Sequence, residues 1–195
     1  DRLFELPGRL ELEPGDYANA LYTAVYAGRE SVLVQLLELP ARGTLTPTAY
    51  GRALLFAASR HREDLMTQLL ALPSPPMIPP ADYGAMLRIA IAEGRQPLVT
   101  RLLDLAARPT LTSDDYGHSV NLAVKTGREV MLDRLLKLSE RQTLSPKDYG
   151  RALKKAVKKG RERPLVALIN LLYRVTPADY VDAVKLAIAW IFSTF

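Results

Sequence analysis

Apolar residues between Leu144 and Leu172 recur at intervals of three and four residues, in two runs separated by a glycine. This spacing places the apolar side chains of each run on one face of an α-helix. Gly160 lies between the runs and can end the first helix, because glycine adopts the left-handed conformation without steric cost. The pattern predicts two helices joined by a tight turn, the second from about Glu162 to Leu171. The apolar positions are Tyr149, Ala152, Leu153, Ala156 and Val157 in the first helix and Leu165, Leu168, Ile169 and Leu172 in the second.

The first helix of each pair opens with a capping signal. In Ser145-Pro146-Lys147-Asp148 the serine hydroxyl can accept a hydrogen bond from a first-turn amide, proline tolerates the first helical position, and aspartate favours the positive helix end. Capping therefore explains the aspartates at this position without a catalytic role; they are Asp82, Asp115, Asp148 and Asp179. The signal recurs as Thr176-Pro177-Ala178-Asp179 and, less completely, as Thr46-Pro47-Thr48-Ala49 and Thr112-Ser113-Asp114-Asp115.

Three sets of residues recur along the chain with a period of 33 residues. Such a period is typical of a solenoid built from one supersecondary unit. The tyrosines are Tyr17, Tyr50, Tyr83, Tyr116 and Tyr149, with Tyr180 following 31 residues later. The turn residues are Gly28, His61, Gly94, Gly127 and Gly160, each followed by an arginine: Arg29, Arg62, Arg95, Arg128 and Arg161. The apolar pairs are Leu36-Leu37, Leu69-Leu70, Leu102-Leu103, Leu135-Leu136 and Leu168-Ile169.

One helix pair cannot bury both of its apolar stripes, so neighbouring pairs must stack to make a core. The sequence predicts an all-α fold: a single repeat domain of about five helix-turn-helix repeats with partial units at both ends. Residues 1–16 are expected to end a preceding repeat, so the chain resembles a piece of a longer protein. The repeats span 17–49, 50–82, 83–115, 116–148 and 149–179, and residues 180–195 are expected to form a capping helix whose aromatics cover the last repeat.

The segment Ala57-Ala58-Ser59-Arg60-His61-Arg62-Glu63-Asp64-Leu65-Met66-Thr67-Gln68-Leu69-Leu70 resembles the A-A-x-x-G-H-x-E-I-V-x-x-L-L portion of the ankyrin repeat. The resemblance covers nearly the whole chain and implies an ankyrin-like α-solenoid. It departs at the T-P-L-H tetrapeptide, replaced by Arg52-Ala53-Leu54-Leu55, and at the β-hairpin segment, replaced by a helix start. A tetratricopeptide array is the competing fold, but its Trp-Leu-Gly-Tyr signature is not in the sequence.

Composition narrows the class of protein. Nearly half of the residues (48%) are hydrophobic and 24% are charged, which is the balance of a folded domain. The longest apolar stretches are interrupted by charges or proline, so we expect a soluble protein with no membrane contact. The chain has no cysteine, which fits a cytoplasmic location, including a host cytosol if the protein is a secreted effector.

The sequence offers little catalytic chemistry. The two histidines, His61 and His118, lack the spacing of a zinc motif, and there is no phosphate-binding glycine loop or nucleophile elbow. We therefore expect neither an enzyme nor a cofactor, metal or small-molecule substrate. The arginine after each turn recurs in every repeat, which favours a structural role: hydrogen bonds to neighbouring loop carbonyls or helix-start carboxylates.

Residues that differ between repeats are better candidates for binding. The ankyrin resemblance implies that the two residues before each turn face a concave binding surface: Tyr26-Ala27, Ser59-Arg60, Ala92-Glu93, Lys125-Thr126 and Lys158-Lys159. The alternative is that these are only solvated helix ends. Together with the densest basic cluster, they give the predicted partner-binding residues Tyr26, Ser59, Arg60, Glu93, Lys125, Lys154, Lys158 and Lys159.

Charge is distributed unevenly. Residues 1–49 hold four basic and seven acidic side chains, whereas residues 116–179 hold fourteen basic and six acidic ones, within a net charge of +5 for the chain. An acidic partner could dock on the basic repeats, unless the charge only keeps them solvated. The cluster comprises Arg151, Lys154, Lys155, Lys158, Lys159, Arg161 and Arg163, with Lys155 in the position of Phe56, Ile89 and Leu122.

Three functions follow from these features. The first is a module that binds a partner protein on its concave face. The second is the substrate-targeting domain of a larger enzyme, such as a bacterial effector acting on a host protein. The third is an array that binds phosphate or nucleic acid through its basic repeats, which the absence of interleaved aromatics makes the weakest of the three.

Overall fold

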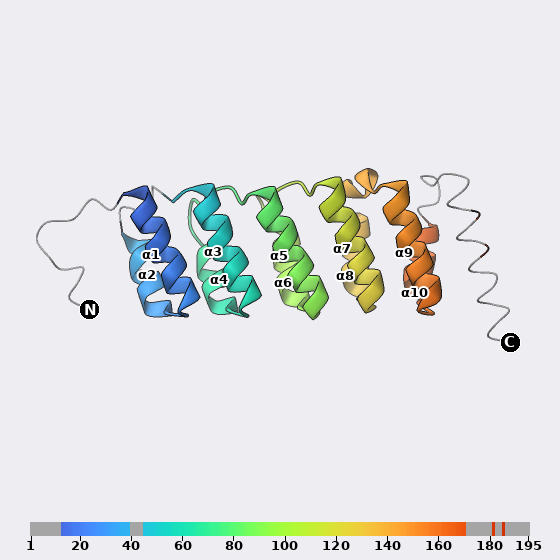
Figure 1. Ribbon diagram of the computed structural model, residues 1–195, viewed down its shortest axis with the longest axis horizontal. Coiled ribbons are helices and arrows are strands. Elements are labelled where there is room, and N and C mark those ends of the chain that lie inside the picture. Colours follow the sequence, from blue (N-terminus) through green and yellow to red (C-terminus); the bar gives the residue numbers. More distant parts are fainter. Residues whose placement is uncertain (1–12, 40–44, 171–180, 182–184, 186–195) are drawn as a thin grey trace, which may run out of the picture. The chain divides into compact units, whose positions relative to one another are not determined.

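The computed structural model describes residues 13–39 and 45–170, together with Val181 and Lys185, and its regular elements there are helices without a strand (Figure 1). These helices confirm the predicted all-α repeat fold. The chain divides into two compact units, residues 1–82 and 83–195. The elements are α1 (Pro14–Tyr26), α2 (Glu30–Glu38), α3 (Pro47–Ser59), α4 (Glu63–Leu70), α5 (Pro80–Glu93), α6 (Gln96–Leu103), α7 (Ser113–Thr126), α8 (Glu129–Lys137), the 3₁₀ helix η2 (Ser139–Thr143), α9 (Pro146–Lys158) and α10 (Glu162–Ile169).

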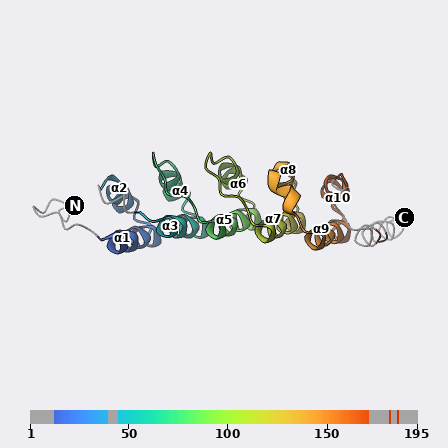
Figure 2. The same cartoon turned by 90° about the horizontal axis from the view of Figure 1, so that it is seen from above.

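Each unit has two layers of helices. In the first unit α1 packs against α2 and α3, α3 against α4, and α2 against α4. In the second unit α7 packs against α8 and α9, α9 against α10, and α8 against α10. Within a unit the first helices of the repeats thus form one layer and the second helices the other, as Figure 2 shows. The core lies between the layers and consists of the apolar stripes predicted from the sequence.

The α9–α10 pair shows how closely the pattern predicts burial. All five predicted core residues of α9 are buried. In α10 Leu168 is buried, Leu165 is half-buried and Ile169 is 39% exposed, while Leu172 lies outside the described residues. The Thr176 helix start, the residues before position 13 and all of the predicted C-terminal cap except Val181 and Lys185 also lie outside them.

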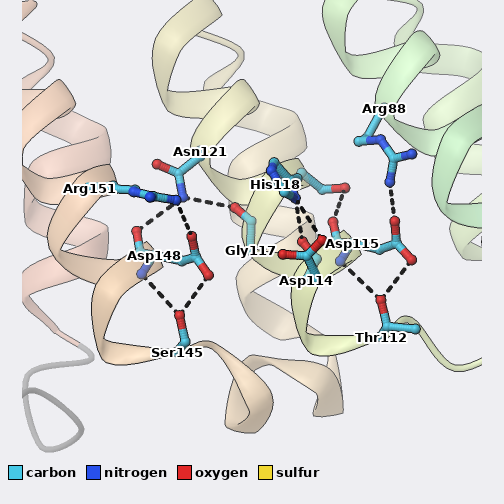
Figure 3. Close-up of polar contacts among 11 residues, drawn as sticks. Arg88, Thr112, Asp114, Asp115, Gly117, His118, Asn121, Ser145, Asp148 and Arg151 are labelled. Atoms are coloured by element: carbon cyan, nitrogen blue, oxygen red, sulfur yellow. Dashed lines mark hydrogen bonds and ion pairs between the residues drawn. The ribbon is translucent and has the colours of Figure 1, made fainter.

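The predicted caps form at the starts of three first helices. The hydroxyls of Thr46, Thr112 and Ser145 accept the backbone N–H three residues on, at 3.2, 3.1 and 3.1 Å. Thr112 and Ser145 also donate to the carboxylates of Asp115 and Asp148, at 2.7 and 2.6 Å (Figure 3). Each aspartate is thus held by the residue that caps its helix.

Every first helix ends in a left-handed residue. The N–H of Gly28 bonds to the Val25 carbonyl at 3.1 Å and the N–H of Arg29 to the Ala24 carbonyl at 2.9 Å, which together make a Schellman turn. The same pair of bonds forms at the four later turns, and His61 takes the left-handed conformation with φ 56° where the others have glycine. His61 as a stand-in for glycine is therefore confirmed.

The repeated tyrosines join the two helices of each repeat. Tyr50 is buried, and its hydroxyl donates to the carbonyl of Leu69 in the last turn of α4, at 3.0 Å. The Leu69 carbonyl also accepts the backbone N–H of Leu72 at 3.4 Å, so the tyrosine hydroxyl adds a second hydrogen bond to an acceptor at the helix end. Burial raises the pKa of Tyr50 to about 12. The other four tyrosines, Tyr17, Tyr83, Tyr116 and Tyr149, donate 19 residues ahead in the same way, to Leu36, Leu102, Leu135 and Leu168.

Successive helix pairs approach closely at two glycine positions of the repeat, the residue after the tyrosine and the turn residue. A Cβ at Gly117, which follows Tyr116, would lie 2.7 Å from Asp148 Oδ2 of the next first helix. A Cβ at the turn residue Gly127 would lie 2.7 Å from both terminal nitrogens of Arg161. The recurring arginine therefore packs over the turn of the preceding repeat, which accounts for its recurrence. Its predicted hydrogen bonds to carbonyls or helix-start carboxylates stay a prediction.

An ion pair with a buried carboxylate connects the segment after α6 to the 3₁₀ helix η2 in the second unit. Arg108 contacts both carboxylate oxygens of Glu140, at 2.5 and 3.1 Å, and Glu140 is only 3% exposed. Burial alone would raise the pKa of Glu140. Hydrogen bonds from Arg108, from its own backbone and from Ser139 outweigh that effect and hold the pKa at about 2.

We expect Tyr50→Phe to lower the free energy of unfolding by about 1 kcal/mol, because the Leu69 carbonyl loses its shorter hydrogen bond and keeps only the one from the Leu72 N–H at 3.4 Å. Urea unfolding followed by circular dichroism measures the change. Tyr26→Phe is the control, since that tyrosine is exposed, and it should change stability by less than about 0.5 kcal/mol. Equal stability of Tyr50→Phe and the wild type would contradict the role of the tyrosine.

We expect Glu140→Gln to lower the free energy of unfolding at pH 7 by about 2 kcal/mol, because it leaves the half-buried Arg108 without its counter-charge. The folded-state pKa is depressed, so the carboxylate stabilises the protein above its ordinary value of 4.5, and this contribution is lost as the pH falls toward 2. The gap between variant and wild type should therefore shrink over that range.

Urea titrations at a series of pH values test this expectation. The double variant Arg108→Met with Glu140→Met is the control, and it should recover most of the stability because no buried charge is left unpaired. A gap that is independent of pH would show that the pair does not act through its charge.

Candidate protein-binding surface

The eight predicted binding residues all lie on first helices or in the turns that follow them, and all are exposed. Seven are at the C-terminal ends of these helices, and Lys154 is in the middle of α9. The structure brings some of them together and not others. In the first unit the assembled residues are aromatic and in the second they are basic.

In the first unit Tyr26 and Arg60 form a cluster with Tyr22 and Phe56, which we call the aromatic patch. The ring centroids of Tyr22 and Tyr26 lie 5.4 and 5.1 Å from that of Phe56, and 6.2 Å from each other. The guanidinium carbon of Arg60 lies 5.3 Å from the Phe56 centroid and 5.7 Å from the Tyr26 centroid. These distances are within the range of cation–π attraction, so the charged group is held over two rings.

The aromatic patch is open to solvent. Tyr22 is 44% exposed and Tyr26 is 59% exposed, which is unusual for residues that could have been buried in the core. In the described part of the chain, neither tyrosine hydroxyl has a hydrogen-bond partner and Arg60 makes no ion pair. The patch therefore presents apolar rings, two hydroxyls and one guanidinium to a ligand.

Ser59 and Glu93 are engaged in local contacts. The Ser59 hydroxyl donates to the Phe56 carbonyl of its own helix at 2.9 Å. Glu93 pairs with the turn arginine Arg95 at 3.3 Å. Both are exposed, but neither is gathered with other predicted binding residues by these contacts.

In the second unit, α7 and α9 carry a cluster that we call the lysine patch: Asn121, Lys125, Lys155 and Lys159. Asn121 is buried, and its side-chain nitrogen donates to the carbonyls of Gly117 and Asp148, at 2.9 and 3.0 Å (Figure 3). Its oxygen then accepts a hydrogen bond from Lys155 Nζ at 3.3 Å. Lys155 is half-buried, and its ammonium is held by the Asn121 amide, which its two bonds to backbone carbonyls keep in one orientation.

The surroundings of Lys155 are strongly basic. Burial lowers the pKa of Lys155, and the positive charges of Lys125 and Arg151 lower it further, against the opposing effect of Asp148. From Pro146 to Lys159 there are six basic residues and one acidic residue, Asp148, which pairs with Arg151 at 3.3 Å. No ion pair neutralises Lys125, Lys158 or Lys159 within the residues described.

The two patches occupy the same four positions of the repeat. Adding three periods, or 99 residues, to Tyr22, Tyr26, Phe56 and Arg60 gives Asn121, Lys125, Lys155 and Lys159. The Tyr22–Phe56 ring contact and the Asn121–Lys155 hydrogen bond are therefore equivalent contacts between successive first helices. One set of positions carries two different chemistries.

The sequence indicated Tyr26, Arg60, Lys125 and Lys159 as binding residues and Lys155 as part of the basic cluster, but not Tyr22, Phe56 or Asn121. These three residues are neither directly before a turn nor in the basic cluster, the two features on which the prediction depended. The signal that could have found the others is the spacing of four residues along a helix combined with one period plus one residue between helices, which places 22, 26, 56 and 60 together.

Other chemistry is limited in the part of the chain that can be described. No group of three potential metal-ligating side chains occurs there, and none of its helices is long and apolar enough to cross a membrane. His118 lies against Asp114 of its own helix, at 3.4 Å. No family model, curated protein or solved structure matches this chain.

We expect Asn121→Leu and Lys155→Met to be energetically coupled. Each single variant should lower the free energy of unfolding by about 1 kcal/mol, because it leaves the other polar group buried without its partner. The loss of stability in the double variant should be about 1 kcal/mol smaller than the sum of the two single losses. Apolar residues occupy the position equivalent to 155 in other repeats, so the double variant leaves no polar group unpaired. Urea unfolding measures all four corners of the cycle.

The control cycle combines Asn121→Leu with Lys137→Gln, an exposed residue of α8, and should be additive within about 0.5 kcal/mol. Additivity in both cycles would mean that Asn121 does not hold Lys155.

Proposed function

We propose that this chain is a protein-interaction module that binds a partner protein on the layer of first helices. The aromatic patch carries the proposal. Tyrosine and arginine are the residue types that most often dominate the energy of an interface, and here two exposed tyrosines and a ring-stacked arginine lie together. Since Tyr22 and Tyr26 contribute nothing to the core from these positions, a ligand is the simplest reason for exposing them.

The packing of the patch supports the same function. Phe56 is half-buried and fixes both tyrosine rings, while Arg60 is restrained by two rings. Restrained side chains lose little conformational entropy when a partner binds, which favours affinity. The frame beneath them is rigid because its helix ends are closed by Schellman turns and tyrosine hydrogen bonds.

We further infer that the repeats are ankyrin-like. The left-handed turn residue followed by arginine stands where the family has Gly-His, and the helix pair has the family's 33-residue period. The replacement of the family's hairpin by a helix start directs attention to the helices as the binding element. Attachment to a larger enzyme, such as an effector, stays a prediction from the sequence.

Affinity capture from a lysate of the source cells, followed by mass spectrometry, tests the proposed function. The double variant Tyr26→Ser with Arg60→Ser should recover the specific partner at least tenfold less than the wild type, as expected for the loss of two dominant contacts. Both side chains are exposed, so the fold should be retained.

The matched control is Val34→Ser with Glu38→Ser, two exposed residues of α2 in the other layer of the same unit. It should recover the partner as the wild type does. Equal recovery by the aromatic-patch variant would refute the proposal, as would equal loss in the control.

A further inference from the structure

We propose that the lysine patch is a docking site for an acidic segment of a partner protein, bound through its aspartate or glutamate carboxylates. The inference rests on the proposed function, and it names the chemistry recognised by the second unit. It is carried by the held position of Lys155 and by the unneutralised charges around it.

The ammonium of Lys155 is held in place by a hydrogen bond to Asn121. Its ammonium has three hydrogens, and Asn121 accepts from one of them at 3.3 Å. Asn121 cannot rotate away without losing its bonds to the carbonyls of Gly117 and Asp148. The remaining donors of Lys155 are thus presented from a fixed point between α7 and α9.

A charged lysine at position 155 is unfavourable in the protein without a ligand. The equivalent positions Phe56, Ile89 and Leu122 are apolar, so a lysine is not needed to pack the layer. The depressed pKa of Lys155 shows that burial and the nearby Lys125 and Arg151 disfavour its charged form. A bound carboxylate would relieve both effects, because it supplies the missing counter-charge and an acceptor.

Favourable placement at helix ends explains part of the basic cluster but not Lys155. Lys125, Lys158 and Lys159 lie at the C-terminal ends of α7 and α9, where positive charge is stabilised by the helix dipole. The helix-dipole effect does not require a lysine to be buried or hydrogen-bonded to an amide. Lys155 is both half-buried and hydrogen-bonded to Asn121, so its ammonium is held in one position.

The composition of the patch favours an acidic peptide over a nucleic acid. Single-stranded nucleic acids are held by aromatic side chains that stack on bases, and the described residues of the patch include none. The patch offers lysine ammonium groups as charged hydrogen-bond donors, and a flexible acidic peptide can place several carboxylates along the two helices.

Fluorescence anisotropy with a labelled octaglutamate peptide tests the inference on the full chain. Lys125→Gln with Lys159→Gln should weaken binding about tenfold, and the double variant Asn121→Leu with Lys155→Met about fivefold. The control Lys137→Gln with Lys147→Gln removes the same charge from exposed positions outside the patch and should weaken binding less than threefold. Circular dichroism verifies that each variant is folded.

Three results would overturn the inference: no peptide binding at millimolar concentration, equal weakening by the control, or tighter binding of octauridylate than of octaglutamate. The last result would assign the patch to nucleic acid. If the lysine variants leave peptide binding unchanged while Tyr26→Ser with Arg60→Ser still abolishes partner capture, the proposed function stands and this inference fails.

Discussion

The hydrogen bond from a buried tyrosine to the last turn of the next helix is the constraint on which each repeat depends. It fixes the first helix against the second at a constant separation of 19 residues in the five helix pairs that the structure describes. A carbonyl at a buried helix end lacks the regular helical bond, and the carbonyls of Leu36, Leu69 and Leu135 each accept one backbone N–H besides the tyrosine hydroxyl. The tyrosine supplies its donor from the core while its ring fills apolar space. Its period is therefore the period of the whole architecture.

This internal frame leaves the exposed face of the first helices free to vary. The tyrosine, the turn residue, the arginine and the buried apolar positions recur because each is needed for the contact between helices or between repeats. The residues at the positions of the two patches differ between repeats and make different contacts. In the first unit they hold stacked rings and in the second a hydrogen-bonded lysine, on the same backbone geometry. In the proposed function, the recurring residues stabilise the frame and the patch residues contact the partner, so the ligand can change while the fold is kept.

Much of the frame could be predicted from the sequence because it is local and periodic. The caps at Ser145 and Thr112, the left-handed turn at His61 and the core stripe of α9 follow from short-range rules. The role of the tyrosines could not be inferred in this way, since their partner is 19 residues away and is a backbone atom. The glycines after Tyr50, Tyr83 and Tyr116 were not predicted for a similar reason: the aspartate that requires their small size lies on the next first helix. The patches were predicted only in part, because Phe56 and Asn121 act through contacts between successive helices that no single repeat reveals.

The central claim is that one frame carries interchangeable patches, and a transplant tests it most directly. The side chains of the aromatic patch would be placed in the second unit through Asn121→Tyr, Lys125→Tyr, Lys155→Phe and Lys159→Arg. The measurement is octaglutamate affinity together with urea unfolding followed by circular dichroism. The account predicts an unchanged helical spectrum, cooperative unfolding and an affinity at least tenfold weaker, because the held lysine and the charge of Lys125 are gone. A chain that loses its helical fold, or one that binds the peptide as tightly as before, would contradict it.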